Sequence, residues 1–324
     1  MDFDNGLVFA YTLNGEGGGE KLDWNGVHSW HEETGFLWVH LDFTYTYAQQ
    51  WIKEESGVDE IVAEALLADE TRPRSSIMNK GLLVMLRGVN MNPGADPEDM
   101  VAIRIWIEGK RIITTRKRRL LSIDDICQLI DQNNGPKIPS ELFTMLTDRL
   151  VARMSVVIDD IDEEVDRLEN DVVESENPQL RQELSALRSQ VIALRRYLAP
   201  QREAMVRLSQ DKMQWLTDTD RLRLREVSDR IIRYVEDLDA VRDRAAVVQE
   251  ELASRLSEQM NKRMYIFSIV AAVFLPLGFL TGLLGINVGG IPGAENPFGF
   301  EWVIGLLVLL VLIQIWIFKR QRWF

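Results

Sequence analysis

Cysteine and histidine are scarce in this chain. Its 324 residues include one cysteine, Cys127, and three histidines, His28, His31 and His40. A single cysteine excludes a disulfide framework and a thiolate zinc site within one chain. His28 and His31 have a spacing that suits a metal on one helical turn, although a surface or hydrogen-bonded pair is the commoner interpretation. The sequence therefore offers no strong metal site, and we predict no bound cofactor.

A basic surplus is also lacking. The chain has 37 Lys and Arg against 50 Asp and Glu, for a formal net charge of -13. No basic stripe stands out from this acidic background, which argues against a nucleic-acid partner. The glycine-rich residues 15–19 precede an acidic stretch and do not open a helix, as a phosphate-binding loop would, and no catalytic triad or nucleophile elbow is recognisable. We do not expect an enzyme.

The first residues lack the features of a signal peptide. Residues 1–6 are acidic and do not show a basic segment followed by an apolar one. We therefore expect the large N-terminal part to stay in the cytosol.

Two long hydrophobic runs are present near the C-terminus. Residues 264–284 carry no charge and are long enough to cross a bilayer as a helix, and residues 302–318 are near the short limit. Basic residues flank the pair at its outer ends: Lys262, Arg263, Lys319, Arg320 and Arg322. Because positive residues favour the cytoplasmic side, we expect two spans with both termini in the cytosol.

Residues 1–138 show the mixed pattern of an α/β domain. Runs rich in Val, Ile, Leu and aromatic residues predict strands at 7–13, 36–43, 82–90, 101–107 and 111–115. The sequence Glu108-Gly109-Lys110 predicts a hairpin between the last two. Helices are predicted at 48–55, at 58–67 and from Ser122, where Asp125 completes a capping box.

Residues 139–216 predict an acidic helical hairpin that is broken at Asn177-Pro178. Apolar residues recur at three- and four-residue steps from Leu150 to Val172, while carboxylates crowd the other faces between Asp159 and Asp171. A solvated and paired face is the commoner interpretation, and a cation sink or sensor is the alternative. Arginines of the second helix are the expected partners: Arg181, Arg188, Arg195 and Arg196.

A third helix is predicted to start at Thr217, where Asp220 completes a second capping box. Its residues 217–263 would form a stalk, and no proline or glycine interrupts it before Pro276 in the first span. Continued to residue 284, it would be on the order of 100 Å long. Helices of that length persist when they bundle, so the pattern indicates a symmetric oligomer.

The C-terminal motifs resemble those of a known family. Residues 274–282 (FLPLGFLTG), followed by Gly285-Ile286-Asn287, are similar to the CorA-type divalent cation channels, most of which carry Gly-Met-Asn. The continuation at 288–293 and the motifs at 70–74 and 195–202 resemble the ZntB zinc-transporter branch. The resemblance implies a funnel-shaped homopentamer, with residues 264–285 around a central pore, an extracytoplasmic loop at 286–300, a lipid-facing helix at 301–319 and a basic tail at 320–324.

The same resemblance implies an ion-entry motif at Gly285, Ile286 and Asn287. Ile286 replaces the usual Met, so no role is carried over to it. Several copies of the Asn287 side-chain amide around an axis could accept hydrogen bonds from the water molecules of a hydrated divalent ion. A hydrated ion is expected because removal of its first water shell is costly. Glu295 either concentrates cations at the mouth or is a solvated loop carboxylate.

One face of the predicted first span is small or uncharged, which suits a pore lining. Plain helix packing through a small-xxx-small pair is the alternative interpretation of that face. A step of roughly 3.5 residues defines this face. Its members are Ser257, Asn261, Met264, Phe267 or Ser268, Ala271, Leu275, Gly278 and Gly282.

The function implied by the resemblance is zinc movement across the inner membrane of a bacterium, in the direction of uptake, with or without proton coupling. Cd²⁺, Ni²⁺ and Co²⁺ are further candidate ions, because amide oxygens and apolar rings select little between small divalent cations. Two alternatives stay open: a magnesium or cobalt channel of the same architecture, and a non-conducting, membrane-tethered coiled-coil sensor.

Overall fold

The structure is a computed structural model that describes residues 5–78, 80–174, 179–210, 215–286, 291 and 296–320. The chain divides into two compact units, Met1–Gln249 and Glu250–Phe324. The first unit holds a sheet and long helices, and the second holds the apolar segments of the two helices that could cross a membrane.

Seven strands of the first unit form one sheet, in the order β2-β1-β3-β7-β6-β5-β4. β3 and β7 pair in parallel, and the other neighbouring pairs are antiparallel. The strands are β1 (Leu7–Leu13), β2 (Gly19–Leu22), β3 (Phe36–Asp42), β4 (Arg74–Met78), β5 (Gly81–Gly88), β6 (Val101–Glu108) and β7 (Arg111–Arg116).

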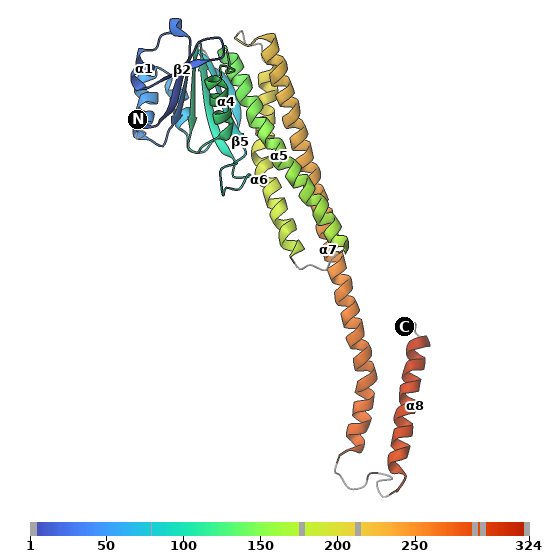
Figure 1. Cartoon of the computed structure of the whole chain (residues 1–324). Coiled ribbons are helices and arrows are strands. Elements are labelled where there is room, and N and C mark those ends of the chain that lie inside the picture. Colours follow the sequence, from blue (N-terminus) through green and yellow to red (C-terminus); the bar gives the residue numbers. More distant parts are fainter. Residues whose placement is uncertain are drawn as a thin grey trace. The chain divides into compact units, whose positions relative to one another are not determined.

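Helices cover both faces of the sheet, with α1 on one side and α4 and α5 on the other (Figure 1). Strand β3 is consequently buried at six successive positions, as expected for a strand that has no solvent face. Trp51, Ile52 and Leu66 pack with sheet residues on one face. On the other, a Cβ added at Gly88 would come within 2.8 Å of the Leu150 side chain of α5. The close approach of α5 to the sheet therefore depends on a glycine.

The shorter helices all belong to this unit. They are α1 (Trp24–Ser29), the 3₁₀ turn η2 (Glu32–Thr34), α2 (Thr46–Gln50), the π-helical turn η3 (Trp51–Glu55), α3 (Glu60–Leu67) and α4 (Leu121–Asp131).

The five strands predicted from the sequence are all present, and so is the hairpin at residues 108–111. The edge strands β2 and β4 and helix α1 were not predicted, because they are short and polar. The capping box at Ser122 was wrong: α4 starts one residue earlier, at Leu121, and no side chain caps it. Asp125 instead binds Arg153 of α5, with both its oxygens 2.7 to 3.0 Å from guanidinium nitrogens.

Three long helices follow: α5 (Pro139–Glu174), α6 (Leu180–Gln210) and α7 (Asp218–Leu284). The apolar stripe of α5 is buried from Leu150 to Val172, as its spacing predicted. The capping box at the start of α7 is confirmed. The Asp220 backbone donates to Thr217 Oγ1 at 3.1 Å, and the Thr217 backbone donates to Asp220 Oδ2 at 3.3 Å. The buried Asp220 carboxylate also accepts from Ser140 of α5 at 2.7 Å, which ties α7 to α5.

The acidic face of α5 is paired, but with a different helix from the one expected. Arg244 of α7 donates to Glu169 at 2.8 and 2.9 Å and to Asp162 at 3.0 Å, and it also binds Asp166. Two of the four arginines of α6 that were the predicted partners contact α7 instead: Arg195 binds Asp239 and Arg188 binds Gln249. Structural pairing therefore accounts for much of this face.

Candidate ion pathway

Helix α7 continues without interruption from the first unit into an apolar segment. Its most apolar 18-residue window has a mean hydropathy of 2.3, and that of α8 (Gly299–Arg320) has 2.4. Neither window is buried within the chain. Exposing so much apolar helix surface to water would cost a large free energy. Lipid or neighbouring subunits would cover this surface instead.

Helices α7 and α8 lie side by side in this unit and run antiparallel (Figure 1). The side-chain amide of Gln314 on α8 donates to the Ala272 carbonyl of α7 at 3.2 Å. One face of α7 is partly covered, at residues separated by three or four positions: Ile269, Ala272, Val273, Pro276, Leu277 and Leu280. At 100° per residue these positions form a single face, and it is the face that meets α8.

Most of the predicted pore-lining residues lie on the opposite face of α7, and Gly278 lies at the edge of that face, where it borders a groove with α8. Leu275 is 71% exposed and Met264 is 63% exposed, and Gly278 and Gly282 would each accept a Cβ with no atom within 4 Å. The structure therefore brings the predicted residues onto one stripe, in which Gly278 borders the groove beside α8 and the other members lie outside that groove. The exposed members of the stripe are Asn261, Met264, Ala271, Leu275, Gly278 and Gly282.

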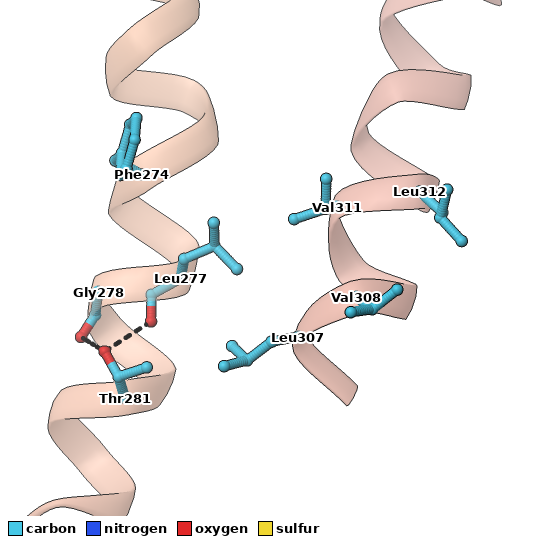
Figure 2. Close-up of a pocket in the computed structure, with 8 residues that line it drawn as sticks. All are labelled: Phe274, Leu277, Gly278, Thr281, Leu307, Val308, Val311 and Leu312. Atoms are coloured by element: carbon cyan, nitrogen blue, oxygen red, sulfur yellow. Dashed lines mark hydrogen bonds between the residues drawn. The ribbon is translucent and has the colours of Figure 1, made fainter. Parts of the chain in front are cut away.

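Gly278 also borders a groove of about 500 Å³ between the two helices. Figure 2 shows Leu277, Gly278 and Thr281 of α7 on one side of the groove, and Leu307 and Val311 of α8 on the other. The Thr281 hydroxyl donates to carbonyls of its own helix, at 3.0 and 3.2 Å, so the groove has an apolar wall. Because Gly278 has no side chain, the space beside it would allow another helix to approach closely.

The predicted entry motif begins where α7 ends. The Gly285 backbone donates to the carbonyls of Thr281 and Gly282 at 3.0 and 3.2 Å, and a Cβ at this position would lie 2.9 Å from the Thr281 oxygen. Glycine thus permits the tight end of the helix. Ile286 follows and is exposed. Asn287 and Glu295 lie outside the described residues, so their roles remain predictions.

The weak metal site proposed at His28 and His31 gains no support. His28 Nδ1 lies 2.5 Å from the Trp24 carbonyl oxygen, and Nε2 lies 2.7 Å from Glu55 Oε2. Both ring nitrogens therefore face acceptors, which favours the doubly protonated ring, and the hydrogen bond to Glu55 raises the pKa of His28. An imidazolium has no lone pair for a metal.

The other soft ligands are equally unsuited to zinc. Burial raises the pKa of Cys127 to about 12, which keeps it a thiol, and His40 is fully buried, with its Nδ1 2.8 Å from the Thr114 hydroxyl. Within the described part of the chain, no three His, Cys, Asp or Glu side chains gather as a metal site would require.

With this geometry in place, comparison with known proteins identifies the family. Residues 33–320 match the model of the CorA-like Mg²⁺ transporter proteins. The chain belongs to the CorA family. It is thus a divalent cation transporter and membrane protein rather than an enzyme.

The CorA family relatives match almost the whole chain. The divalent cation transporter CmaX of Pseudomonas aeruginosa is 40% identical over 99% of this chain and 97% of its own length. The zinc transport protein ZntB of Pectobacterium atrosepticum is 40% identical over 98% of this chain and 96% of its own length.

Solved structures agree with the fold. That of full-length CmaX has a TM-score of 0.85 at 39% identity, and covers 99% of each chain. The CorA magnesium transporter of Methanocaldococcus jannaschii has a TM-score of 0.82 at 18% identity, over 98% of this chain and 99% of its own. The α/β domain, the long helices and the two C-terminal apolar helices of this chain are therefore those of the CorA fold.

One polar residue in the apolar helices of this CorA family member, Gln314, was not predicted to have a role. Gln314 is the one polar side chain between Trp302 and Phe318, and that isolation was a signal that could have singled it out. Its partner was not predictable, because the register of α8 against α7 is a tertiary property.

Proposed function

We propose that five copies of this chain form a symmetric pore in the bacterial inner membrane, through which hydrated divalent cations pass. The proposal is carried by the stripe on α7 that lies opposite the face covered by α8. In a symmetric assembly, α8 would lie outside α7 and face lipid, and the stripes of five α7 helices would surround the axis. The antiparallel helices bring Lys262 and Arg263 to the same end as Lys319 and Arg320, which supports a cytosolic position for that end.

The chemistry of the stripe favours transport of an ion that keeps its water. Residues 264–284 contain no charged, histidine or cysteine side chain. Stripping water from a small divalent ion without offering strong ligands is costly, so the ion would meet amide oxygens at Asn287 and pass apolar rings at Leu275 and Met264. Narrow apolar rings gate by losing water, which would keep the pore closed at rest.

Zinc is the proposed cargo and uptake the proposed direction. Support for zinc comes from relatives named zinc transport protein ZntB, at 40% identity over nearly the full length. The described pathway adds no zinc-specific ligand, so Cd²⁺, Ni²⁺ and Co²⁺ are proposed to share it. Proton coupling, if present, would act outside the spans, since residues 264–284 supply no carboxylate or histidine as a relay.

A magnesium or cobalt channel is the second candidate. The specific observation in its favour is that the stripe lacks cysteine and histidine, the ligands by which proteins select zinc. The matching family model is also described by magnesium transport.

Reconstitution into liposomes that contain an ion-reporting dye separates these functions. Influx of Zn²⁺, Mg²⁺, Cd²⁺, Ni²⁺ and Co²⁺ would be compared with and without a pH gradient. Zinc influx equal to or above magnesium influx is expected. Magnesium influx far above that of zinc would overturn the proposed cargo, and absence of any divalent flux would overturn the transport proposal.

A further inference from the structure

Pro276 leaves one backbone carbonyl of the first span without its usual partner. In an α-helix the N–H of each residue donates to the carbonyl four residues earlier, and proline has no N–H. The carbonyl deprived in this way belongs to Ala272. Both residues lie within the apolar part of α7, where water is not available to replace the missing donor.

Gln314 of α8 supplies a donor to this same carbonyl. Its Nε2 lies 3.2 Å from the Ala272 oxygen, and the side chain is half-buried. An unpaired carbonyl in hydrocarbon costs free energy, so a donor from a neighbouring helix has a clear role at this position.

Gln314 carries an energetic cost of its own in this position. Its Oε1 is enclosed and accepts no hydrogen bond within the described part of the chain. An amide with one unsatisfied end is a poor way to pack two apolar helices, and leucine would avoid the cost. The hydrogen bond to the Ala272 carbonyl offsets this cost, and it orients the amide so that its nitrogen points toward α7.

From this geometry we infer that Gln314 is a positioning residue of the ion pathway. The inference rests on the proposed function, because it assumes that α7 lines the pore. The bond fastens α8 to α7 at the proline step, just before the segment with Gly278, Gly282 and Gly285. Its loss would let that outer segment of α7 adopt other orientations, which would misalign the stripe without changing its side chains.

Four variants test the inference: Gln314→Leu, Pro276→Ala, their combination, and Thr281→Val. Pro276→Ala restores the backbone N–H that would donate to the Ala272 carbonyl. That carbonyl should then no longer need the hydrogen bond from Gln314. Thr281→Val is the matched control, because it removes a membrane hydroxyl that bonds only within α7 in the described structure. The full-length protein would be compared in liposomes for maximal divalent flux, for the half-saturating ion concentration and for its thermal midpoint.

We expect Gln314→Leu to lower maximal flux roughly 3- to 20-fold, the range that follows from measured membrane hydrogen bonds. The half-saturating concentration should not change, because the entry motif is untouched. In the Pro276→Ala background the same replacement should change flux less than about twofold. Thr281→Val should leave the thermal midpoint as it is.

An equal effect of Gln314→Leu in both backgrounds, or no effect in either, would overturn the inference. The thermal midpoints of the same variants give a second double-mutant cycle, which can be measured even if the protein transports no ion. Coupling between positions 276 and 314 in the midpoints, in a protein that passes no ion, would contradict the proposed function while leaving the contact established. If Gln314→Leu fails to assemble, Gln314→Met retains the length of the side chain without the amide.

Discussion

The guanidinium of Arg87 on β5 lies over the Tyr197 ring of α6, with 3.9 Å between its central carbon and the ring centre. Its nitrogens donate to the carbonyls of Thr71 and Met100 at 2.9 to 3.2 Å. The Arg87 backbone donates to the buried Gln201 side chain at 2.7 Å. The motifs at residues 70–74 and 195–202, which the sequence analysis singled out, therefore meet at one arginine.

Replacement of Arg87 should loosen this junction between the sheet edge and α6. Arg87→Met leaves the Thr71 and Met100 carbonyls without these donors, so we expect a loss of about 2–3 kcal/mol in unfolding free energy. Arg87→Lys should recover little, because an ammonium cannot make the forked contacts. Hydrogen exchange of β4 and residues 68–73, measured by mass spectrometry, reports the local effect. Unchanged protection there in Arg87→Met would contradict the assignment.

Arg244 on α7 is expected to hold the acidic face of α5. Arg244→Gln would leave three carboxylates to repel one another, so unfolding free energy should fall by about 1–2 kcal/mol at low salt. The loss should shrink at high salt, because screening weakens the repulsion. Denaturant titration of the detergent-solubilised protein measures both.

Arg225 of the same helix provides the matched control. It is exposed, and the described structure shows no carboxylate paired with it. Arg225→Gln should change stability by less than about 0.5 kcal/mol. Equal effects at Arg225 and Arg244 would show that α5 does not depend on the specific contacts.

His28 and His40 should titrate on opposite sides of the ordinary value of 6.5. The hydrogen bond to Glu55 raises the pKa of His28, and burial lowers the pKa of His40. The pair of His28 with Glu55 therefore stabilises the fold fully below pH 6.5, and that stability is lost as pH rises through the pKa of the folded state. Both side chains are well exposed, at 40% and 38%, so the contribution is small.

Exchange of the histidine ring C–H, followed by mass spectrometry, gives each pKa in the intact protein. Glu55→Gln should move the pKa of His28 down and leave that of His40 in place. An unchanged His28 pKa in this variant would refute the pairing.

Glu295 tests whether the predicted mouth concentrates cations. Glu295→Gln should lower zinc influx at low ion concentration, and the gap should close as ion or salt is raised, because the effect is a long-range field. Glu301→Gln, at the start of α8, serves as a control of equal charge. Influx that stays at the wild-type level under every condition would favour a solvated loop carboxylate.

Local patterns in the sequence predicted most of the fold. The capping box at Thr217 and Asp220 and the buried stripe of α5 are decided by residues three and four apart, so they could be found without tertiary information. The edge strand β4 (Arg74–Met78) is held by its partner β5 and by Ser75 against Ala204, and carries little pattern of its own. The predicted partner of the acidic face of α5 was wrong for a similar reason, because tertiary packing decides whether arginines of α6 or of α7 reach that face.

The stripe on α7 was predictable because helical spacing determines which residues share a face. Its position opposite α8 could not be predicted, since two apolar helices offer many possible registers. The bond between Gln314 and Ala272 selects one of them. The role predicted for Asn287 at the mouth of the pore depends on the resemblance of the motif Gly285-Ile286-Asn287 to that of the family.

Accessibility of single cysteines along α7 tests the pathway most directly. The chain has one native cysteine, so Cys127→Ser gives a clean background. In liposomes, a charged thiol reagent should block divalent influx after Leu275→Cys or Gly282→Cys, and should leave influx unchanged after Val273→Cys or Leu280→Cys. Block at 273 and 280, with none at 275 and 282, would contradict a pore lined by the face opposite α8.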